Sequence, residues 1–238
     1  MTTKPAELPS LSPSALEFVQ SVVALRPQVA VFDCDGTLWD GDAGADFFFW
    51  EIERGLLPDS VVQWALPRYK DYRVGKVEEE TMCGEMVTIH AGIPEKVLQQ
   101  AAEEFFVSVI EPRIFPEMQQ LTHILAEAGC EIWAVSSTNL WVICAGVKRF
   151  GIPANRVLAA TVEVANGLAT DRLVHVPTDE GKAAAIRKHL SRPVDVCCGN
   201  SIHDAAMMEI AKHAFAIGPT RELLEIAREK NWGLHRSS

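Results

Sequence analysis

The sequence predicts an α/β protein in which helices cover a mostly parallel β-sheet. Short apolar runs at 29–32, 131–136, 157–160, 194–198 and 214–217 are typical of buried parallel strands. Helical spacing of apolar residues occurs between strands, and the alternation of strands with helices indicates right-handed crossovers. With 238 residues, 48% of them apolar, the chain suits one domain with an insertion.

The predicted helices are placed by their apolar spacing and by their end signals. The first spans 14–24 and is followed by Arg26-Pro27 and the first strand. Later helices are expected at 116–128, before Gly129, and at 140–150.

Two other segments have their own signatures. Thr161 to Thr170 is predicted to form a hairpin, because Asn166-Gly167 suits a tight primed turn. Residues 41–111 lack strand alternation and carry helical periodicity, so we expect a helical insertion there.

Residues 29–38 read Val-Ala-Val-Phe-Asp-Cys-Asp-Gly-Thr-Leu, an apolar strand that ends in two acids. Ligands of open α/β sheets bind beyond the carboxyl ends of the strands. Side chains at i and i+2 of an extended segment point the same way, so Asp33 and Asp35 can converge on one reacting atom or one metal ion. A solvated Asp-x-Asp-Gly turn is the alternative for these residues taken alone.

The Asp-x-Asp-Gly-Thr-Leu segment resembles motif I of the haloacid dehalogenase-like superfamily, most of whose members are phosphatases with an aspartate nucleophile. Further segments match its other motifs in order: the apolar run that ends at Ser136, Lys182 near a helix start, and Gly199-Asn-Ser-Ile-His-Asp204. The resemblance implies a Rossmann-like core of residues 1–40 and 112–238. It also implies a small helical cap at 41–111, as in the phosphoserine phosphatase-like and phosphorylcholine phosphatase-like branch.

The resemblance also assigns roles to single residues. Asp33 would attack phosphorus and form an aspartyl-phosphate, while Asp35 would act as general acid and then general base. Ser136 and the backbone N–H of Ser137 would bind phosphate oxygens, and Lys182 would offset the charge of Asp33 and the phosphoryl group.

A magnesium ion is the implied cofactor, because a carboxylate needs a cation beside it to approach a phosphate dianion. By analogy its ligands would be the Asp33 carboxylate, the Asp35 backbone carbonyl and the Asn200 side chain, with Asp204 holding metal-bound waters. The family usually has Asp at position 200. The neutral amide of Asn200 is expected to weaken metal binding without abolishing activity.

The insertion is the expected place for selectivity toward the leaving group. Asp42 occupies the position where phosphoserine phosphatases carry a Glu that binds the substrate's ammonium, but 82–86 lacks their carboxylate-binding Arg. An acid with aromatic neighbours favours an amino-alcohol phosphate over phosphoserine, although rings of this kind also pack cores. His203 is expected to touch phosphate or substrate, to cap a helix, or to be merely exposed. The aromatic side chains in question are Trp39, Phe47, Phe48, Phe49, Trp50, Trp64, Tyr69 and Tyr72.

Charge and composition exclude several partners. The net charge of −10 argues against binding nucleic acid or anionic membranes.

Met1 to Pro9 has no apolar core of a secretory signal, so a cytoplasmic location is expected. The six cysteines lack metal-ligand spacing and are expected to be reduced thiols, with Cys34 turned into the core. The oligomeric state is left open.

A magnesium-dependent phosphatase of a small metabolite is the main functional hypothesis. Phosphoserine phosphatase, a phosphotransferase and a non-catalytic phosphate-binding protein are the alternatives. Dehalogenases lack a second acid equivalent to Asp35, and P-type ATPases need apolar stretches of about 20 residues that this chain does not contain.

Overall fold

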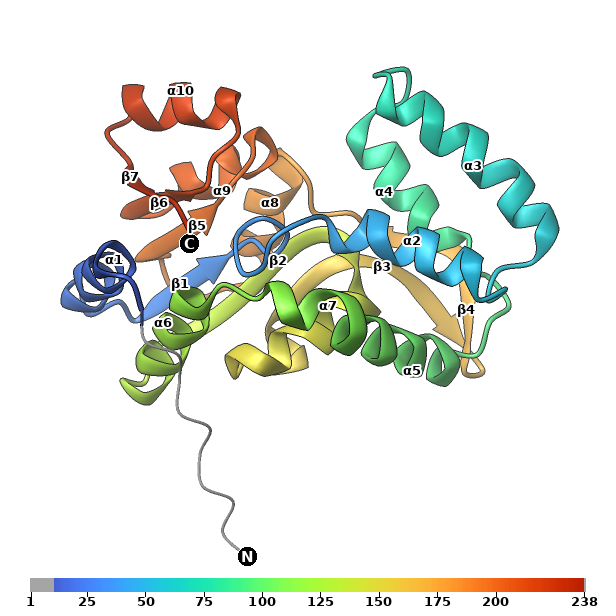
Figure 1. The fold of residues 1–238 in the computed structure, drawn as a ribbon, viewed down its shortest axis with the longest axis horizontal. Coiled ribbons are helices and arrows are strands. Elements are labelled where there is room, and N and C mark those ends of the chain that lie inside the picture. Colours follow the sequence, from blue (N-terminus) through green and yellow to red (C-terminus); the bar gives the residue numbers. More distant parts are fainter. Residues whose placement is uncertain (1–10, 238) are drawn as a thin grey trace, which may run out of the picture.

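The computed structural model describes residues 11–237, so Met1 to Pro9, on which the expectation about a secretory signal rests, lie outside the described part. Seven strands form one sheet in the order β4-β3-β2-β1-β5-β6-β7 (Figure 1). All neighbours are parallel except β3 and β4. The predicted α/β fold is confirmed. The strands are β1 Val29–Phe32, β2 Glu131–Asn139, β3 Val157–Ala165, β4 Leu168–His175, β5 Val196–Gly199, β6 His213–Ile217 and β7 Gly233–His235.

Helices cover both faces of the sheet. Successive residues of the central strand β1 point to opposite faces, so each face contributes to its own apolar cluster. Ala30 and Phe32 of β1 belong to one apolar cluster, and Val29 and Val31 belong to another. The first cluster includes α1 Pro13–Ala24, α6 Pro116–Glu127 and α7 Leu140–Val147. The second includes α8 Glu180–His189, α9 Ala205–Glu209 and α10 Arg221–Glu229.

The ends of the elements follow local sequence signals. The Ser12 side chain accepts a hydrogen bond from the Ala15 N–H and caps α1. Asn166 and Gly167, with φ of 53° and 78°, form the turn of the β3–β4 hairpin, as predicted. β2 runs three residues beyond the predicted end at Ser136, and β7 was not predicted.

The segment after β1 is helical, as the sequence predicted. It holds α2 Ala43–Glu53, α3 Asp59–Arg73, α4 Glu79–Thr88 and α5 Glu95–Phe105. α3 stands away from the sheet in Figure 1, whereas α4 contacts β2, β3 and β4, and α5 packs beside α7. A separate apolar cluster joins α2, α3 and α4 through Phe48, Ala65 and Met86. This arrangement leaves α2 and α4 beside the end of β1.

All six cysteines are free thiols, and Cys34 is fully buried in the core, as expected. Within residues 11–237, no helix combines the length and apolar character needed to cross a bilayer.

Candidate active site

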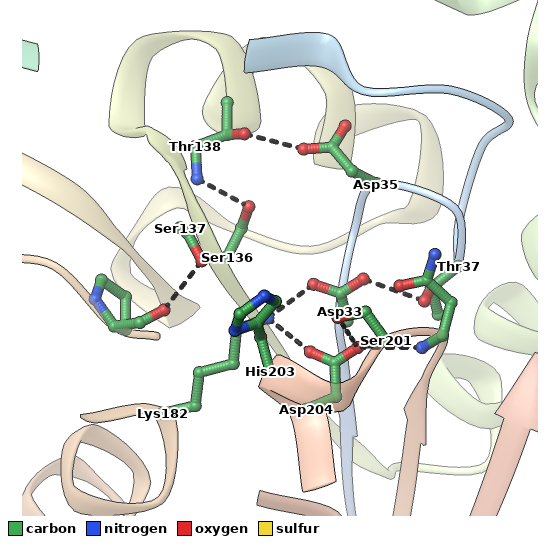
Figure 2. A network of polar contacts seen from close by, with 12 residues as sticks. Asp33, Asp35, Thr37, Ser136, Ser137, Thr138, Lys182, Ser201, His203 and Asp204 are labelled. Carbon is green, nitrogen blue, oxygen red and sulfur yellow. Dashed lines mark hydrogen bonds and ion pairs between the residues drawn. The ribbon is translucent and has the colours of Figure 1, made fainter. Parts of the chain in front are cut away.

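The three central strands deliver the candidate catalytic residues to one edge of the sheet. β1 lies between β2 and β5. Asp33 follows β1, Ser136 lies in β2, and Asn200 follows β5. After β1 the chain builds β2, β3 and β4 on one side of it and then β5, β6 and β7 on the other, so the strand order reverses at β1, which is where ligands bind in open α/β sheets. Figure 2 shows the convergence of Asp33 with Lys182 and Asp204.

Lys182 is buried between two carboxylates. Its Nζ lies 2.8 Å from Oδ1 of Asp33 and 2.6 Å from Oδ1 of Asp204. Burial and the Asp204 charge raise the pKa of Asp33 to about 6, although Lys182 opposes this shift. Burial alone would lower the pKa of Lys182, but the Asp204 and Asp33 carboxylates raise it. The ammonium is therefore retained beside Asp33.

Asp35 lies apart from this group and has its own set of donors. Its Oδ1 accepts hydrogen bonds from the Trp39 indole and the Ala43 N–H, each at 2.7 Å, and its Oδ2 lies 2.7 Å from the Thr138 hydroxyl. Burial and the charge of Asp42 raise the pKa of Asp35 to about 7. Asp35 can therefore hold a proton near neutral pH, which a general acid requires.

The expected phosphate-binding groups are the Ser136 hydroxyl and the backbone N–H of Ser137. Ser136 Oγ accepts a hydrogen bond from the Thr138 N–H at 3.1 Å, which leaves its own proton to be donated to a ligand. Ser137 Oγ donates to the Pro177 carbonyl at 3.3 Å. Both serines line the same cavity as Asp33 and Lys182.

Asp204 is occupied by donors from the protein. Its Oδ2 accepts from the Asn200 and Ser201 backbone N–H groups, each at 2.9 Å, while Oδ1 contacts Lys182. The residue is fully buried. Asp204 thus fixes both the ammonium and the turn that carries Asn200.

Gly36 lets this turn approach the chain after β1. It has a φ of +71°, and a Cβ on it would lie 1.9 Å from Asn200 Nδ2. Any side chain at position 36 would therefore displace the Asn200 side chain.

The residues present fit the implied metal in their chemistry. Within residues 11–237, no three His, Cys, Asp or Glu side chains are grouped to hold an ion. The donors expected from the sequence are different: Asp33 would supply a carboxylate, Asn200 an amide oxygen and Asp35 a backbone carbonyl. Such an all-oxygen set with one carboxylate is what Mg²⁺ takes when substrate phosphate and water complete its shell.

The cavity has a volume of about 270 Å³ and runs from the aspartates between α2 and α4. Asp42 caps α2 by accepting from the Ala45 N–H at 2.9 Å, and Glu79 lines the wall at the start of α4. Of the aromatic residues considered above, Phe47, Phe48, Tyr69 and Tyr72 line the cavity.

The cavity wall offers no guanidinium to a ligand, since no arginine of residues 11–237 lines it. The cavity is lined by Met82, Cys83 and Met86 at the segment where recognition of phosphoserine would need an arginine. Arg68, from α3, is held by Glu85 in two hydrogen bonds of 2.7 and 2.8 Å. Its charge is therefore already paired.

His203 lies at the cavity wall and is bonded to another loop. Its Nδ1 is 2.8 Å from Oδ1 of Asp179, and its Nε2 is 3.9 Å from a Glu79 oxygen. Asp179 has a φ of +48° in a turn closed by a 2.7 Å hydrogen bond from the Gly181 N–H to the Thr178 carbonyl. His203 thus joins the turn before Asp204 to the turn before α8.

The supporting roles of three residues were missed by sequence reasoning. Thr37 donates to Oδ2 of Asp33 at 2.9 Å, and Trp39 and Thr138 bind Asp35. The signal for Thr37 and Trp39 was their position four residues after each acid. Thr138 had no signal beyond its place after Ser136.

Comparisons with known proteins agree with this geometry. Residues 30–209 match the model of the haloacid dehalogenase-like hydrolase family. The chain is 24% identical over 215 residues to a histidinol-phosphatase of Neisseria meningitidis, covering 86% of this chain and 96% of that protein. It is 25% identical over 218 residues to phosphoserine phosphatase SerB1 of Mycobacterium tuberculosis, covering 85% and 68%.

A solved structure of a Bordetella pertussis protein of unknown function shares the fold. Its TM-score is 0.76 at 22% identity, and the match covers 87% of this chain and 97% of that one. The chain therefore belongs to the haloacid dehalogenase-like hydrolases, in the branch that includes the phosphoserine phosphatases, and it is a phosphatase.

Proposed function

We propose that the protein is a magnesium-dependent phosphomonoester hydrolase that cleaves a small amino-alcohol phosphate through an aspartyl-phosphate on Asp33. One observation carries this proposal. The Asp33 carboxylate, 2.8 Å from the Lys182 ammonium, shares a cavity with Asp35, whose pKa is raised to about 7. A charged nucleophile and a protonated acid in one cavity are what stepwise ester hydrolysis needs.

In the first step, an Asp33 oxygen bonds to phosphorus while the bond from phosphorus to the ester oxygen breaks. The departing oxygen takes the proton of Asp35, so the leaving group departs as a neutral alcohol. Lys182 and the Ser136 hydroxyl stabilise the phosphoryl charge. The Thr37 hydroxyl, 2.9 Å from Asp33 Oδ2, orients the carboxylate.

In the second step, Asp35 takes a proton from water, and the water oxygen attacks phosphorus. The bond between phosphorus and Asp33 breaks, which releases phosphate and restores the carboxylate. Asp33, Asn200 and the Asp35 carbonyl would hold Mg²⁺, which neutralises phosphate charge when bound. We propose that residues 41–111 serve as a cap that excludes water during these steps.

The lining of the cavity supports an amine-bearing leaving group. Asp42 and Glu79 are acids at its wall, whereas Lys182 is already paired with Asp33 and Asp204. A substrate ammonium gains from such acids, and a substrate carboxylate finds no cation there. This favours amino-alcohol phosphates over phosphoserine. Histidinol, in the name of the Neisseria relative, is itself an amino alcohol.

The experiment is a phosphate-release panel with phosphoethanolamine, phosphocholine, histidinol phosphate, phosphoserine and p-nitrophenyl phosphate. We expect Mg²⁺-dependent release that is faster for the amino-alcohol phosphates than for phosphoserine. Asp33→Asn is expected to keep its fold and to lose turnover. Equal or reversed rates for phosphoserine would reject the substrate class, and turnover by Asp33→Asn would reject the nucleophile.

Product analysis with added acceptor alcohols separates hydrolysis from phosphotransfer. We expect inorganic phosphate as the product when the alcohols are present. A new phosphate ester formed at the expense of free phosphate would instead identify a phosphotransferase.

A further inference from the structure

A buried pair of titratable residues in the cavity wall has no part in the steps above. Glu51, in the last turn of α2, and His90, just beyond α4, both line the cavity, yet each is only 1% exposed. Oε2 of Glu51 lies 2.8 Å from Nε2 of His90. A buried carboxylate costs folding free energy unless something is gained from it.

This pair lies at the end of the cavity remote from the catalytic acids. Asp35 binds the N–H of Ala43 in the first turn of α2, and Glu51 lies eight residues further along the helix. At a rise of 1.5 Å per residue, that separates the two backbone positions by about 12 Å. The cavity follows one helix face, because Gly44, Phe47 and Glu51 line it at helical spacing.

The opposite wall follows α4 in the same way. Glu79, Met82 and Met86 line the cavity along this helix, and His90 lies beyond its end. A leaving group attached to phosphorus at Asp33 therefore extends between α2 and α4 toward Glu51.

The imidazole is held so that the Glu51 carboxylate keeps one free oxygen. The Val87 carbonyl, 3.1 Å from His90 Nδ1, can only accept, so Nδ1 carries a proton. The ring packs near Phe47, with centroids 6.2 Å apart, and edge-on to Trp141 at 5.3 Å. His90 occupies Oε2 of Glu51, which leaves Oε1 as the oxygen available to a ligand in the cavity.

We propose that Glu51, oriented by His90, is a second recognition carboxylate, which accepts a hydrogen bond from a nitrogen N–H at the end of the leaving group remote from the ester oxygen. The inference rests on the proposed function and extends it. The substrate has an amine near the ester, at Asp42 and Glu79, and a nitrogen base further along. A leaving group ending in a carboxylate or a second phosphate has no N–H to donate to Oε1 and gains no hydrogen bond there.

The test compares two ligands that differ in the distal group alone. Histidinol phosphate and phenylalaninol phosphate share the 2-aminoalkyl phosphate, but only the imidazole carries a distal N–H. Their Kd values are measured by calorimetry in the Asp33→Asn background, where the ligand is not consumed. We expect histidinol phosphate to bind at least tenfold more tightly, a difference of about 1.4 kcal/mol.

Glu51→Gln, added to that background, removes the charge but keeps an amide that hydrogen-bonds His90. We expect it to lower the preference for histidinol phosphate about tenfold. Glu51→Asp, which keeps the charge but withdraws it by one methylene, is the second variant and is expected to retain part of the preference.

Glu117→Gln is the matched control, because Glu117 and His235 form a similar buried pair, 3.1 Å apart, that does not line this cavity. It should leave the preference unchanged.

The outcomes separate this inference from the proposed function. Equal affinity for the two ligands, or an equal loss of both with Glu51→Gln, overturns the role of Glu51. A preference that depends on Glu51, in a protein that hydrolyses no amino-alcohol phosphate, supports Glu51 and rejects the proposed reaction.

Discussion

The Thr138 hydroxyl lies 2.7 Å from Oδ2 of Asp35, whereas the Trp39 and Ala43 N–H groups both reach Oδ1. N–H groups can only donate, so Oδ1 is occupied and the proton of neutral Asp35 resides on Oδ2. Thr138 must then accept from Oδ2, and it donates again once the carboxylate is charged. The Thr138 hydroxyl therefore changes from acceptor to donor when Asp35 loses its proton.

Thr138→Val is expected to shift the pH dependence of kcat/KM. The wild-type rate should fall as pH rises through about 7, where Asp35 loses its proton. The Thr138 hydrogen bond to the charged carboxylate is stronger than the bond to the neutral acid, so its removal raises the pKa of Asp35 and moves this limb to higher pH. A hydrogen bond worth about 1 kcal/mol corresponds to somewhat less than one pH unit. Thr138→Ser should restore the wild-type profile, and a limb that stays in place or moves down would contradict the assignment.

Lys182→Met is expected to destabilise the fold more than Asp33→Asn does. The first leaves two buried carboxylates without their cation, at a cost of about 3 to 5 kcal/mol. The second leaves the pair of Lys182 and Asp204 intact, 2.6 Å apart.

Urea unfolding at pH 7.5 and 5.5 measures this difference. The pKa of Asp33 is raised by burial, so acid protonates it in the folded state, and the penalty of Lys182→Met should shrink at the lower pH. A larger loss of unfolding free energy for Asp33→Asn than for Lys182→Met would contradict the view that the Lys182 ammonium stabilises the two buried carboxylates.

Asn200→Asp should strengthen metal activation. The substitution preserves the shape that packs against Gly36 and adds a negative charge beside Asp33, which favours a divalent cation. We expect the Mg²⁺ concentration for half-maximal activity to fall about tenfold in a titration of initial rates. Asn231→Asp, beyond the end of α10, adds the same charge elsewhere and should leave the titration unchanged.

Asp42→Asn should lower selectivity for an amine near the ester. Asn caps helices as well as Asp, so α2 keeps its cap while the charge is lost. We expect the ratio of kcat/KM for phosphoethanolamine to that for p-nitrophenyl phosphate to fall about tenfold. An unchanged ratio would leave Glu79 as the group that binds the ammonium.

Much of the fold was predictable, because apolar strand runs and turn residues carry local signals. The hairpin at Asn166-Gly167 and the helix end at Gly129, with a φ of +82°, depend on backbone conformations that few residues adopt. β7 could not be predicted, since Gly233–His235 has three residues and forms a strand only by pairing with β6.

The candidate site also combines residues that the sequence predicts with contacts that only the packing of distant segments creates. Asp33 and Lys182 were predicted from a sequence resemblance, and the structure places them 2.8 Å apart. The pairing of Glu51 with His90 spans 39 residues and depends on how α2 lies against α4. Such packing leaves no local pattern in a single sequence.

The placement of the site residues has a consequence for redesign. Asp33, Ser136 and Asn200 arise from neighbouring strands, whereas Asp42, Glu51 and Glu79 arise from α2 and α4 or their ends. The proposed roles therefore assign reactivity and choice of substrate to different parts of the chain. New specificities should be obtainable by randomising the helical wall alone, with every library member retaining an intact hydrolytic apparatus.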